Sequence, residues 1–332
     1  MQNNKTVLIT GAAGFIGSHM CELMIKKNFN VIGVDDISTG SIDNLKNIIN
    51  KKKFLLIKKN LLELKKLDFK NKKIKYIFHF AGKGDVVPSI EKPFEYVNTN
   101  ILATTKILEL ARKLSVKKFV YAASSSCYGL NNKKLDEKTK ISLEHPYALS
   151  KYYGEQIALN WSKIYRLPVN SIRIFNAYGP RVRTSSNYGA VFGVFFKQKL
   201  ENKALTIVGD GNQKRDYVFV TDVCEAFYLA AKTNLSGQIF NLGNGSPQKI
   251  NFLASILNCK NKTYIPKRPG EPDVTWANIN KISKLLGWKP KVSFERGVKI
   301  MLKNIGYWKK APLWNKSKIK KATASWFKIL SK

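Results

Sequence analysis

Three polar residues in the middle of the sequence have the types and spacing that acid–base chemistry requires. Tyr147 and Lys151 are four residues apart, which places them on one face of a helix. A free phenol has a pKa of about 10, and an ammonium group one helical turn away stabilises the phenolate and lowers that pKa. Ser124 ends an apolar run typical of a buried strand, where its hydroxyl could bond the same substrate oxygen as the tyrosine. We expect these three residues to be catalytic, but a Tyr–Lys pair alone is common on helices, so the prediction depends on the surrounding motifs.

A glycine-rich turn near the N-terminus has the spacing of a phosphate-binding loop. Gly11, Gly14 and Gly17 follow a short apolar run and open a helical stretch. Glycines let the backbone turn tightly and approach a pyrophosphate, to which the helix N-terminus offers free N–H groups. About twenty residues further on, the next apolar run ends in Asp35-Asp36, where a carboxylate can bond the ribose hydroxyls of adenosine. An acidic residue there repels a 2′-phosphate, so the pattern predicts NAD rather than NADP.

The elements that must position these residues alternate regularly up to about residue 175. Short apolar runs predict buried strands, and the segments between them have helical patterns. The expected strands lie near residues 7–9, 31–34, 54–57, 74–80, 119–122 and 171–174, and the expected helices near 14–26, 93–114 and 147–165. This alternation predicts an α/β fold, a Rossmann-type doubly wound parallel sheet with helices on both faces.

Beyond residue 176, loops rich in Gly, Asn and Pro separate shorter elements, as in a smaller lobe that closes over a ligand. We expect an NAD-binding domain with the catalytic residues over 1–175, a mainly substrate-binding C-terminal lobe over 176–305, and a basic, tryptophan-containing tail over 306–332. In this tail Ile319, Ala322, Trp326 and Ile329 have helical spacing. A terminal helix docked on the core and an interfacial membrane helix both fit this pattern, and docking is the commoner arrangement.

The composition excludes several classes of protein. The 332 residues include 58 Lys and Arg against 22 Asp and Glu, a formal net charge of +36, and 44% are hydrophobic. The apolar content excludes wholesale disorder, and no run is long enough to span a membrane. Only eight of the basic residues are Arg, the side chain that reads bases. We therefore expect a solvated surface and no nucleic-acid partner, with a surface for polyanions or anionic lipids as the alternative.

The N-terminus has no signal-peptide pattern and the four cysteines form no CxxC pair, so we expect a cytoplasmic protein with reduced thiols and no metal site.

Several motifs in a fixed order suggest a family. They are Gly11-x-x-Gly14-x-x-Gly17, Ser124 four residues before Tyr128-Gly129, Tyr147-x-x-x-Lys151, and the run from Phe175 to Pro180. Together they resemble the extended short-chain dehydrogenase/reductase family, and more narrowly its nucleotide-sugar epimerases and dehydratases. The resemblance extends to about residue 305.

The resemblance implies an NAD-dependent isomerase that epimerises a nucleotide-diphosphate sugar at C4. Tyr147 would take the proton of the sugar 4-hydroxyl while hydride passes from C4 to NAD⁺, and Ser124 would share the hydrogen bonding of that hydroxyl. Lys151 would bond the nicotinamide ribose and lower the pKa of Tyr147. The 4-keto sugar would then turn in the site and take the hydride back on its other face. Relatives of this kind are commonly homodimers through a four-helix contact, which the helices near 93–114 and 147–165 could form.

The complete set of expected site residues combines the motifs with this resemblance. Cofactor binding is expected at Gly11, Gly14, Phe15, Ile16, Gly17, Asp35, Asp36, Asn60, Leu61, Phe80, Ala81, Gly82, Lys83, Asn100, Tyr147, Lys151 and Phe175. Substrate binding is expected at Val86, Ser124, Ser125, Ser126, Asn176, Arg215, Arg268, Glu271 and Thr275. Among these, Arg215 and Arg268 resemble the arginines that hold the substrate pyrophosphate, and Glu271 would bond the nucleotide ribose. Asn60 stands where the family commonly has an Asp that bonds the adenine amine, and its amide oxygen can still accept that bond.

The activity and the sugar have alternatives. Dehydratases of this family carry an Asp-Glu pair where this sequence has Ser125-Ser126, and hydroxyls do not easily replace carboxyl groups as acid and base, so an epimerase is favoured over a dehydratase or decarboxylase. The resemblance favours a UDP-hexose or UDP-N-acetylhexosamine first, because Thr275 aligns with a position that is bulky in family members restricted to plain hexoses and small in those that admit an N-acetyl group. A UDP-uronate is second, because Arg181 and Arg183 could meet a carboxylate. The non-enzyme alternative is an NAD-binding scaffold with a basic surface.

Overall fold

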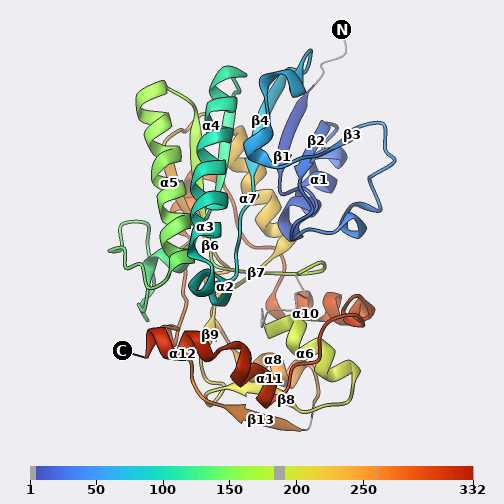
Figure 1. The fold of residues 1–332 in the computed structure, drawn as a ribbon, viewed down its shortest axis with the longest axis vertical. Coiled ribbons are helices and arrows are strands. Elements are labelled where there is room, and N and C mark those ends of the chain that lie inside the picture. Colours follow the sequence, from blue (N-terminus) through green and yellow to red (C-terminus); the bar gives the residue numbers. More distant parts are fainter. Residues whose placement is uncertain (1–4, 183–190, 260, 332) are drawn as a thin grey trace.

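A sheet of seven parallel strands forms the centre of the computed structural model, which describes residues 5–182, 191–259 and 261–331 (Figure 1). The strand order is β3-β2-β1-β4-β5-β6-β11. The strands are β1 (Thr6–Thr10), β2 (Asn30–Asp35), β3 (Phe54–Lys58), β4 (Ile74–His79), β5 (Lys118–Ser124), β6 (Val169–Ile174) and β11 (Gln238–Leu242). The order reverses between β1 and β4, and in such sheets the ligand crevice lies at the carboxyl ends of the strands at this point.

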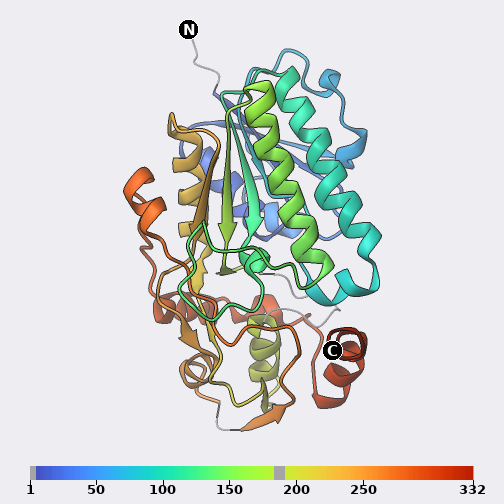
Figure 2. The ribbon, with the colours of Figure 1, turned by 90° about the vertical axis from the view of Figure 1, so that its left-hand side faces the viewer.

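Helices cover both faces of the sheet (Figure 2). The covering helices are α1 (Phe15–Lys26) and α7 (Val220–Lys232) on one face, and α4 (Ala103–Lys113) and α5 (Pro146–Tyr165) on the other. Successive side chains of a strand point to opposite faces, so Val7 and Ile9 of β1 join the apolar cluster that contains Phe227 of α7, whereas Leu8 joins the cluster that contains Ile107 of α4. The predicted doubly wound α/β fold is confirmed.

The predicted helix over residues 93–114 is not regular. It is preceded by α2 (Val86–Glu91) and consists of α3 (Pro93–Val97), a π-helical turn over Asn98–Leu102, and α4. Asn100 lies in the π turn and is buried, where its side chain accepts a hydrogen bond from the Lys83 backbone N–H at 2.8 Å and donates one to the Ser150 hydroxyl at 2.9 Å. Turns of this kind interrupt α-helices, frequently at functional sites. Here the turn fastens the loop after β4 to α5.

The smaller lobe contains shorter elements around an aromatic core. Its elements are β7 (Asn176–Tyr178), α6 (Val191–Leu200), β8 (Leu205–Val208), β9 (Lys214–Arg215), β10 (Tyr217–Phe219), β12 (Gln248–Lys249), α8 (Ile250–Ile256), β13 (Lys262–Ile265) and α10 (Phe294–Lys303). Helix α9 (Asn280–Leu286) instead packs on α7 and β11 of the sheet domain. The rings of Tyr178, Phe192, Tyr217 and Phe294 pack together, and the Tyr217 and Phe294 centroids lie 4.8 Å apart. Between β10 and β12 the chain returns to the large sheet as α7 and β11. The division at residues 175 and 305 stays a prediction, but residues 220–242 within the expected lobe belong to the sheet layer.

The C-terminal tail packs on the protein rather than projecting from it. It contains a 3₁₀ turn (Ile305–Trp308), α11 (Lys316–Ala322) and α12 (Ala324–Leu330). Trp308 packs on Phe196 with ring centroids 4.6 Å apart, and Ile319 and Trp326 are buried, whereas Ile329 is exposed. The structure therefore has the docked arrangement of the tail. None of the helices within the described residues is both long and apolar enough to cross a membrane.

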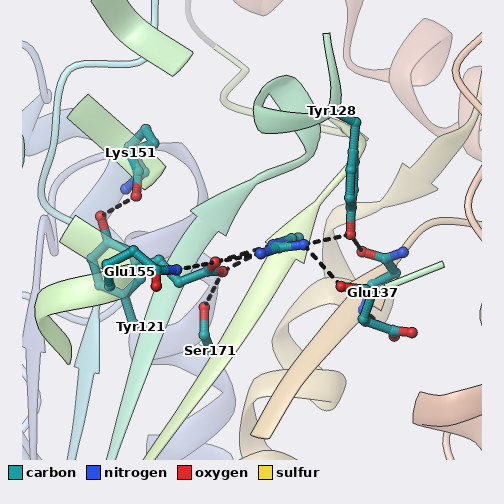
Figure 3. A network of polar contacts seen from close by, with 9 residues as sticks. Tyr121, Tyr128, Glu137, Lys151, Glu155 and Ser171 are labelled. Carbon is teal, nitrogen blue, oxygen red and sulfur yellow. Dashed lines mark hydrogen bonds and ion pairs between the residues drawn. The ribbon is translucent and has the colours of Figure 1, made fainter. Parts of the chain in front are cut away.

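A buried ion pair joins α5 to the sheet (Figure 3). Arg173 of β6 and Glu155 of α5 are almost fully buried, and Nη2 of the arginine lies 2.6 Å from Oε1 of the glutamate. Ser171 donates to the same carboxylate at 2.9 Å. Arg173 also donates to the hydroxyl of Tyr128 at 2.8 Å, and that hydroxyl donates to Oδ1 of Asn241 in β11 at 2.7 Å. One polar network therefore connects α5, the turn after β5, and the edge strand β11.

We expect the single variant Glu155→Leu to lower the free energy of unfolding by about 3–5 kcal/mol, because it leaves the Arg173 guanidinium buried without a counter-charge. The double variant Glu155→Leu/Arg173→Met should lose much less, since no unpaired charge remains. Unfolding in urea followed by circular dichroism measures both losses. Equal losses in the two variants would contradict a stabilising role for charge pairing.

Candidate active site

The predicted site residues surround a cavity of about 1160 Å³ between the carboxyl ends of the strands and the smaller lobe. Every residue predicted to bind cofactor or substrate lines this cavity, with the exception of Asn100. Asn100 lies behind the lining, where its amide holds both backbone polar groups of Lys83. In this structure it supports the wall of the site and is not part of its surface.

The glycine loop has the geometry of a cradle for a phosphate group. Gly11 has φ +70, and a Cβ atom there would lie 2.7 Å from the backbone nitrogen of Ala81. A Cβ atom on Gly17 would collide with the carbonyl oxygen of Gly11. Gly14 is the N-cap of α1 and has no side chain to accept from the first N–H groups of the helix. These groups remain available to an anion at the positive end of the helix dipole.

The two acids at the end of β2 have different surroundings. Asp35 is buried and accepts from the backbone N–H groups of Ala13 at 2.9 Å and Ile37 at 2.8 Å, so it ties the glycine loop to the end of the strand. Burial raises the pKa of this carboxyl, and the two backbone N–H groups oppose the shift. Asp36 is more exposed and accepts from the Asn60 amide at 3.3 Å. The side chains of Asp35, Asp36 and Asn60 all line the cavity, as a site for an adenosine ribose requires.

Tyr147 and Ser124 meet where β5 ends and α5 begins. His145 caps α5 by accepting from the Ala148 N–H at 3.2 Å, and Pro146 occupies the first helical turn, so the helix starts just before the tyrosine. The His145 ring stacks on the Tyr147 ring with centroids 5.9 Å apart and an interplanar angle of 4°. The Ser124 and Ser126 hydroxyls lie close enough to the phenol to oppose the rise in its pKa that burial causes.

Burial and the neighbouring hydroxyl groups act on the pKa of Tyr147 in opposite directions. Burial raises the pKa of Tyr147, and the groups that oppose this shift most are the hydroxyls of Ser124 and Ser126. Lys151 is itself buried, which lowers its pKa to about 8, and its Nζ lies 4.6 Å from the centre of the Tyr121 ring. The spacing places both residues on one helix face, and the lowering of the phenol's pKa by Lys151 stays a prediction. Additional positive charge beside Tyr147 is needed to form a phenolate.

Two arginines of the smaller lobe share one carboxylate. Oε2 of Glu271 lies 3.7 Å from Nη2 of Arg215, and Oε1 lies 3.3 Å from Nε of Arg268. The two cations would repel each other, and the carboxylate between them holds them side by side. Because guanidinium groups bind phosphate oxygens in a two-pronged manner, the pair is suited to a diphosphate.

Thr275 controls the orientation of Asn176. Its hydroxyl accepts from the backbone N–H of Asp216 at 3.0 Å and donates to Oδ1 of Asn176 at 2.7 Å. The oxygen of the Asn176 amide is therefore engaged, so that its NH₂ group is the end left for a ligand. The small size of Thr275 is evident from the sequence, but its hydrogen bond to Asn176 is not.

Asp216 organises the loops around Arg215 and was not among the predicted residues. Its buried carboxylate accepts from the backbone N–H groups of Asn244, Gly245 and Ala277 at 2.5–3.1 Å. Burial raises its pKa to about 6, against the effect of these N–H groups. In the sequence, the one feature that could have drawn attention to Asp216 is its position directly after Arg215.

Three other cavity residues were given different roles or none. His145 and Trp326 line the cavity. From the sequence, no role was expected for His145, and Trp326 was placed only on the apolar face of a terminal helix. Arg181 lines it as well, but its guanidinium is paired with Glu22 at 2.6 Å. Arg183, the other candidate for a uronate carboxylate, lies outside the described residues.

Comparisons with known proteins agree with the geometry. A family model described as GDP-mannose 4,6 dehydratase matches residues 8–301. A protein of Bacillus subtilis (strain 168) named as an uncharacterized UDP-glucose epimerase is 36% identical over 305 residues, which cover 88% of this chain and 95% of that protein.

Solved structures are similar over almost the same length. UDP-glucuronic acid 4-epimerase from Bacillus cereus, in complex with UDP-glucuronic acid and NAD, has a TM-score of 0.84 at 31% identity and covers 91% of this chain and 99% of its own. UDP-N-acetylglucosamine 4-epimerase from Methanobrevibacter ruminantium M1, in complex with UDP-N-acetylmuramic acid, has a TM-score of 0.84 at 29% identity and covers 92% of this chain and 100% of its own. With the glycine loop, the Ser–Tyr–Lys set and a matching family model, the chain belongs to the family described as GDP-mannose 4,6 dehydratase, within the extended short-chain dehydrogenases/reductases.

Proposed function

We propose that the protein is an NAD-dependent 4-epimerase of a nucleotide-diphosphate sugar, with a UDP-hexose or UDP-N-acetylhexosamine as substrate. The observation that carries this proposal is that the Tyr147 phenol and the Ser124 hydroxyl line the same cavity as the glycine loop and the arginine pair. A binding scaffold has no need of such a phenol beside a cofactor cradle. The relatives named for UDP-glucose, UDP-glucuronic acid and UDP-N-acetylglucosamine support UDP as the nucleotide.

The residues present fit NAD. The cradle at Gly11 and Gly17 leaves no room for side chains and suits a pyrophosphate, and Asp35 and Asp36 offer carboxylates to an adenosine ribose while repelling a 2′-phosphate. Bound NAD⁺ would supply the hydride acceptor and the positive charge that favours a Tyr147 phenolate. Lys151 would hold the nicotinamide ribose.

In the proposed reaction Tyr147 first takes one proton from the sugar and later returns one to it. Tyr147 takes the proton of the sugar 4-hydroxyl as that carbon is oxidised, and Ser124 holds the same oxygen by a hydrogen bond. Tyr147 returns the proton when the 4-keto sugar is reduced on its other face. Arg215 and Arg268 hold the diphosphate, so that the sugar can turn without leaving the site. Oxidation and reduction cancel within one cycle.

Epimerisation is favoured over loss of water or carbon dioxide. Ser125 and Ser126 stand where dehydratases of the family have two carboxyl groups, and the Ser126 hydroxyl is bonded to Ser124 at 2.8 Å. A hydroxyl cannot easily serve as the additional acid and base that dehydration needs. For the sugar, the pairing of Arg181 with Glu22 disfavours this arginine as the partner of a uronate carboxylate.

We also propose that the protein is a cytoplasmic homodimer. Leu102, Leu149, Tyr153 and Ile164 are exposed large apolar side chains on or beside α4 and α5, which lie next to each other on the outside of the sheet (Figure 1). A second copy of the same helices could cover them. The four cysteines are free thiols, which is consistent with a reducing compartment.

Purified protein incubated with UDP-glucose or UDP-N-acetylglucosamine, without added reductant, should form an equilibrium mixture of the two C4 epimers. Chromatography with mass detection measures both products. A product lighter by one water would favour the dehydratase, and conversion of UDP-glucuronic acid alone would favour the uronate alternative. No turnover of UDP, dTDP, GDP or CDP sugars would contradict the enzyme proposal.

Tyr147→Phe should lower kcat by about 10³-fold, because the ring and its packing remain while the proton-transferring hydroxyl is lost. Binding of NAD, measured by absorbance after denaturation of the purified protein, should be unchanged. Tyr165→Phe is the matched control, since Tyr165 is exposed at the end of the same helix, does not line the cavity, and its change should leave kcat as it is. Activity retained in Tyr147→Phe would refute the assigned role.

Thr275→Val should lower kcat/KM by about five- to tenfold, because it removes the hydroxyl that orients Asn176 and leaves the Asp216 N–H without its acceptor. Thr275→Ser keeps that hydroxyl and should remain within about twofold of the parent protein. Steady-state kinetics on the best UDP-sugar compare the three proteins. Equal losses in both variants would indicate that the methyl group, and not the hydrogen bond, is what matters.

A further inference from the structure

We infer that Trp326, in the C-terminal helix α12, is a positioning residue that holds Arg268 in place for the diphosphate of the substrate. The inference rests on the proposed function, since it assigns a nucleotide diphosphate to the cavity that Arg268 lines. It gives a role to a tail that lies beyond the matched family region, which ends at residue 301.

Trp326 touches the arginine loop in two ways. The centre of its ring lies 5.4 Å from the Cζ atom of Arg268, and its indole N–H donates to the carbonyl oxygen of Pro269 at 2.5 Å. The indole is 3% exposed, and it lines the cavity together with Arg268, Glu271 and Arg215. The ring face therefore restrains the guanidinium while the indole N–H restrains the backbone next to it.

The loop backbone is shaped to accept α12. Gly270 has φ +72, a left-handed conformation that favours glycine, and a Cβ atom there would lie 3.3 Å from Leu330 of α12. Arg268 is thus held from three sides, by the Trp326 ring, by the Glu271 carboxylate and by a loop that packs closely on the helix. Restricting a side chain with many rotamers before the ligand arrives lowers the entropic cost of binding.

The tail is itself anchored at both ends, so that it can hold the loop. Near its start, Gln198 of α6 donates to the carbonyl oxygen of Trp314 at 2.8 Å, and Trp308 is buried on Phe196. Near its end, Ser325 donates to Glu91 of α2 at 3.0 Å, and α12 lies beside α2 (Figure 1). The tail therefore runs from the smaller lobe to the sheet domain across the part of the cavity that holds the arginine pair.

The inference is tested by comparing a ligand that has the diphosphate with one that lacks it. Trp326→Ala should raise the Kd of UDP about tenfold and leave the Kd of uridine unchanged, because the arginine meets only the phosphates. Trp326→Phe keeps a ring face over Arg268 and should recover most of the UDP affinity. Calorimetry for UDP and ligand-observed NMR for uridine need no turnover. Ile329→Ala, an exposed position of the same helix, is the matched control and should change neither constant.

A double-mutant cycle separates action through Arg268 from a general effect. Arg268→Gln should weaken UDP binding, and adding Trp326→Ala to it should weaken binding by less than about twofold further. Additive losses of UDP affinity in the two variants would overturn the inference. A parallel loss of uridine affinity, which direct stacking of Trp326 on the base would cause, would overturn it too. UDP binding that is equally tight in Trp326→Ala would overturn it as well, while leaving the proposed function intact. A parent protein that binds no UDP would overturn the UDP-sugar proposal and this inference with it.

Discussion

A charge pair that cannot reach water holds helix α5 against strand β6, and α5 carries Tyr147 and Lys151. Glu155 follows these two residues at intervals of four, so one face of the helix presents the phenol, the ammonium and the carboxylate in succession. The carboxylate also acts through space, because it opposes the lowering of the Lys151 pKa that burial causes. Through Arg173 and Tyr128 the same network reaches the turn that follows Ser124. The relative position of the phenol and the serine hydroxyl therefore depends on contacts deep in the sheet.

The local motifs made the fold and most of the site predictable. The glycine loop, the acids after β2 and the Tyr–Lys pair each depend on short-range spacing, and all lie at the cavity as expected. The return of α7 and β11 to the sheet was not predictable in this way. The segment of α7 and β11 lies between the short elements of the smaller lobe, and the pairing of β11 with β6 depends on a contact between segments more than sixty residues apart. The effect of Lys151 on the phenol stays a prediction, because spacing defines a helix face but not how strongly burial acts on the groups that lie on it.

The role of Trp326 illustrates another limit. Helical spacing of apolar residues indicates that one face of a helix packs against the protein. The spacing is the same whether that face packs in the core or forms part of the wall of a cavity. Only the three-dimensional path of the tail brings its end next to the arginine loop, more than fifty residues earlier in the chain. Asp216 is comparable, since a buried carboxylate that serves three backbone N–H groups looks like any surface acid in the sequence.

The widened turn at Asn98–Leu102 has a consequence for the length of this segment. An α-helix advances by about 100° per residue, so one additional residue in a turn changes the phase between the helices on its two sides. In α3 the buried Tyr96 donates to the carbonyl oxygen of Asp85 at 2.6 Å, while α4 directs Ile107 and Ala111 at the sheet. The buried face of α3 and the buried face of α4 can both keep these contacts only if the turn between them has its present length. Insertion or deletion of a single residue here would rotate one of the two faces away from its packing partners, so the packing on both sides constrains the number of residues in this segment.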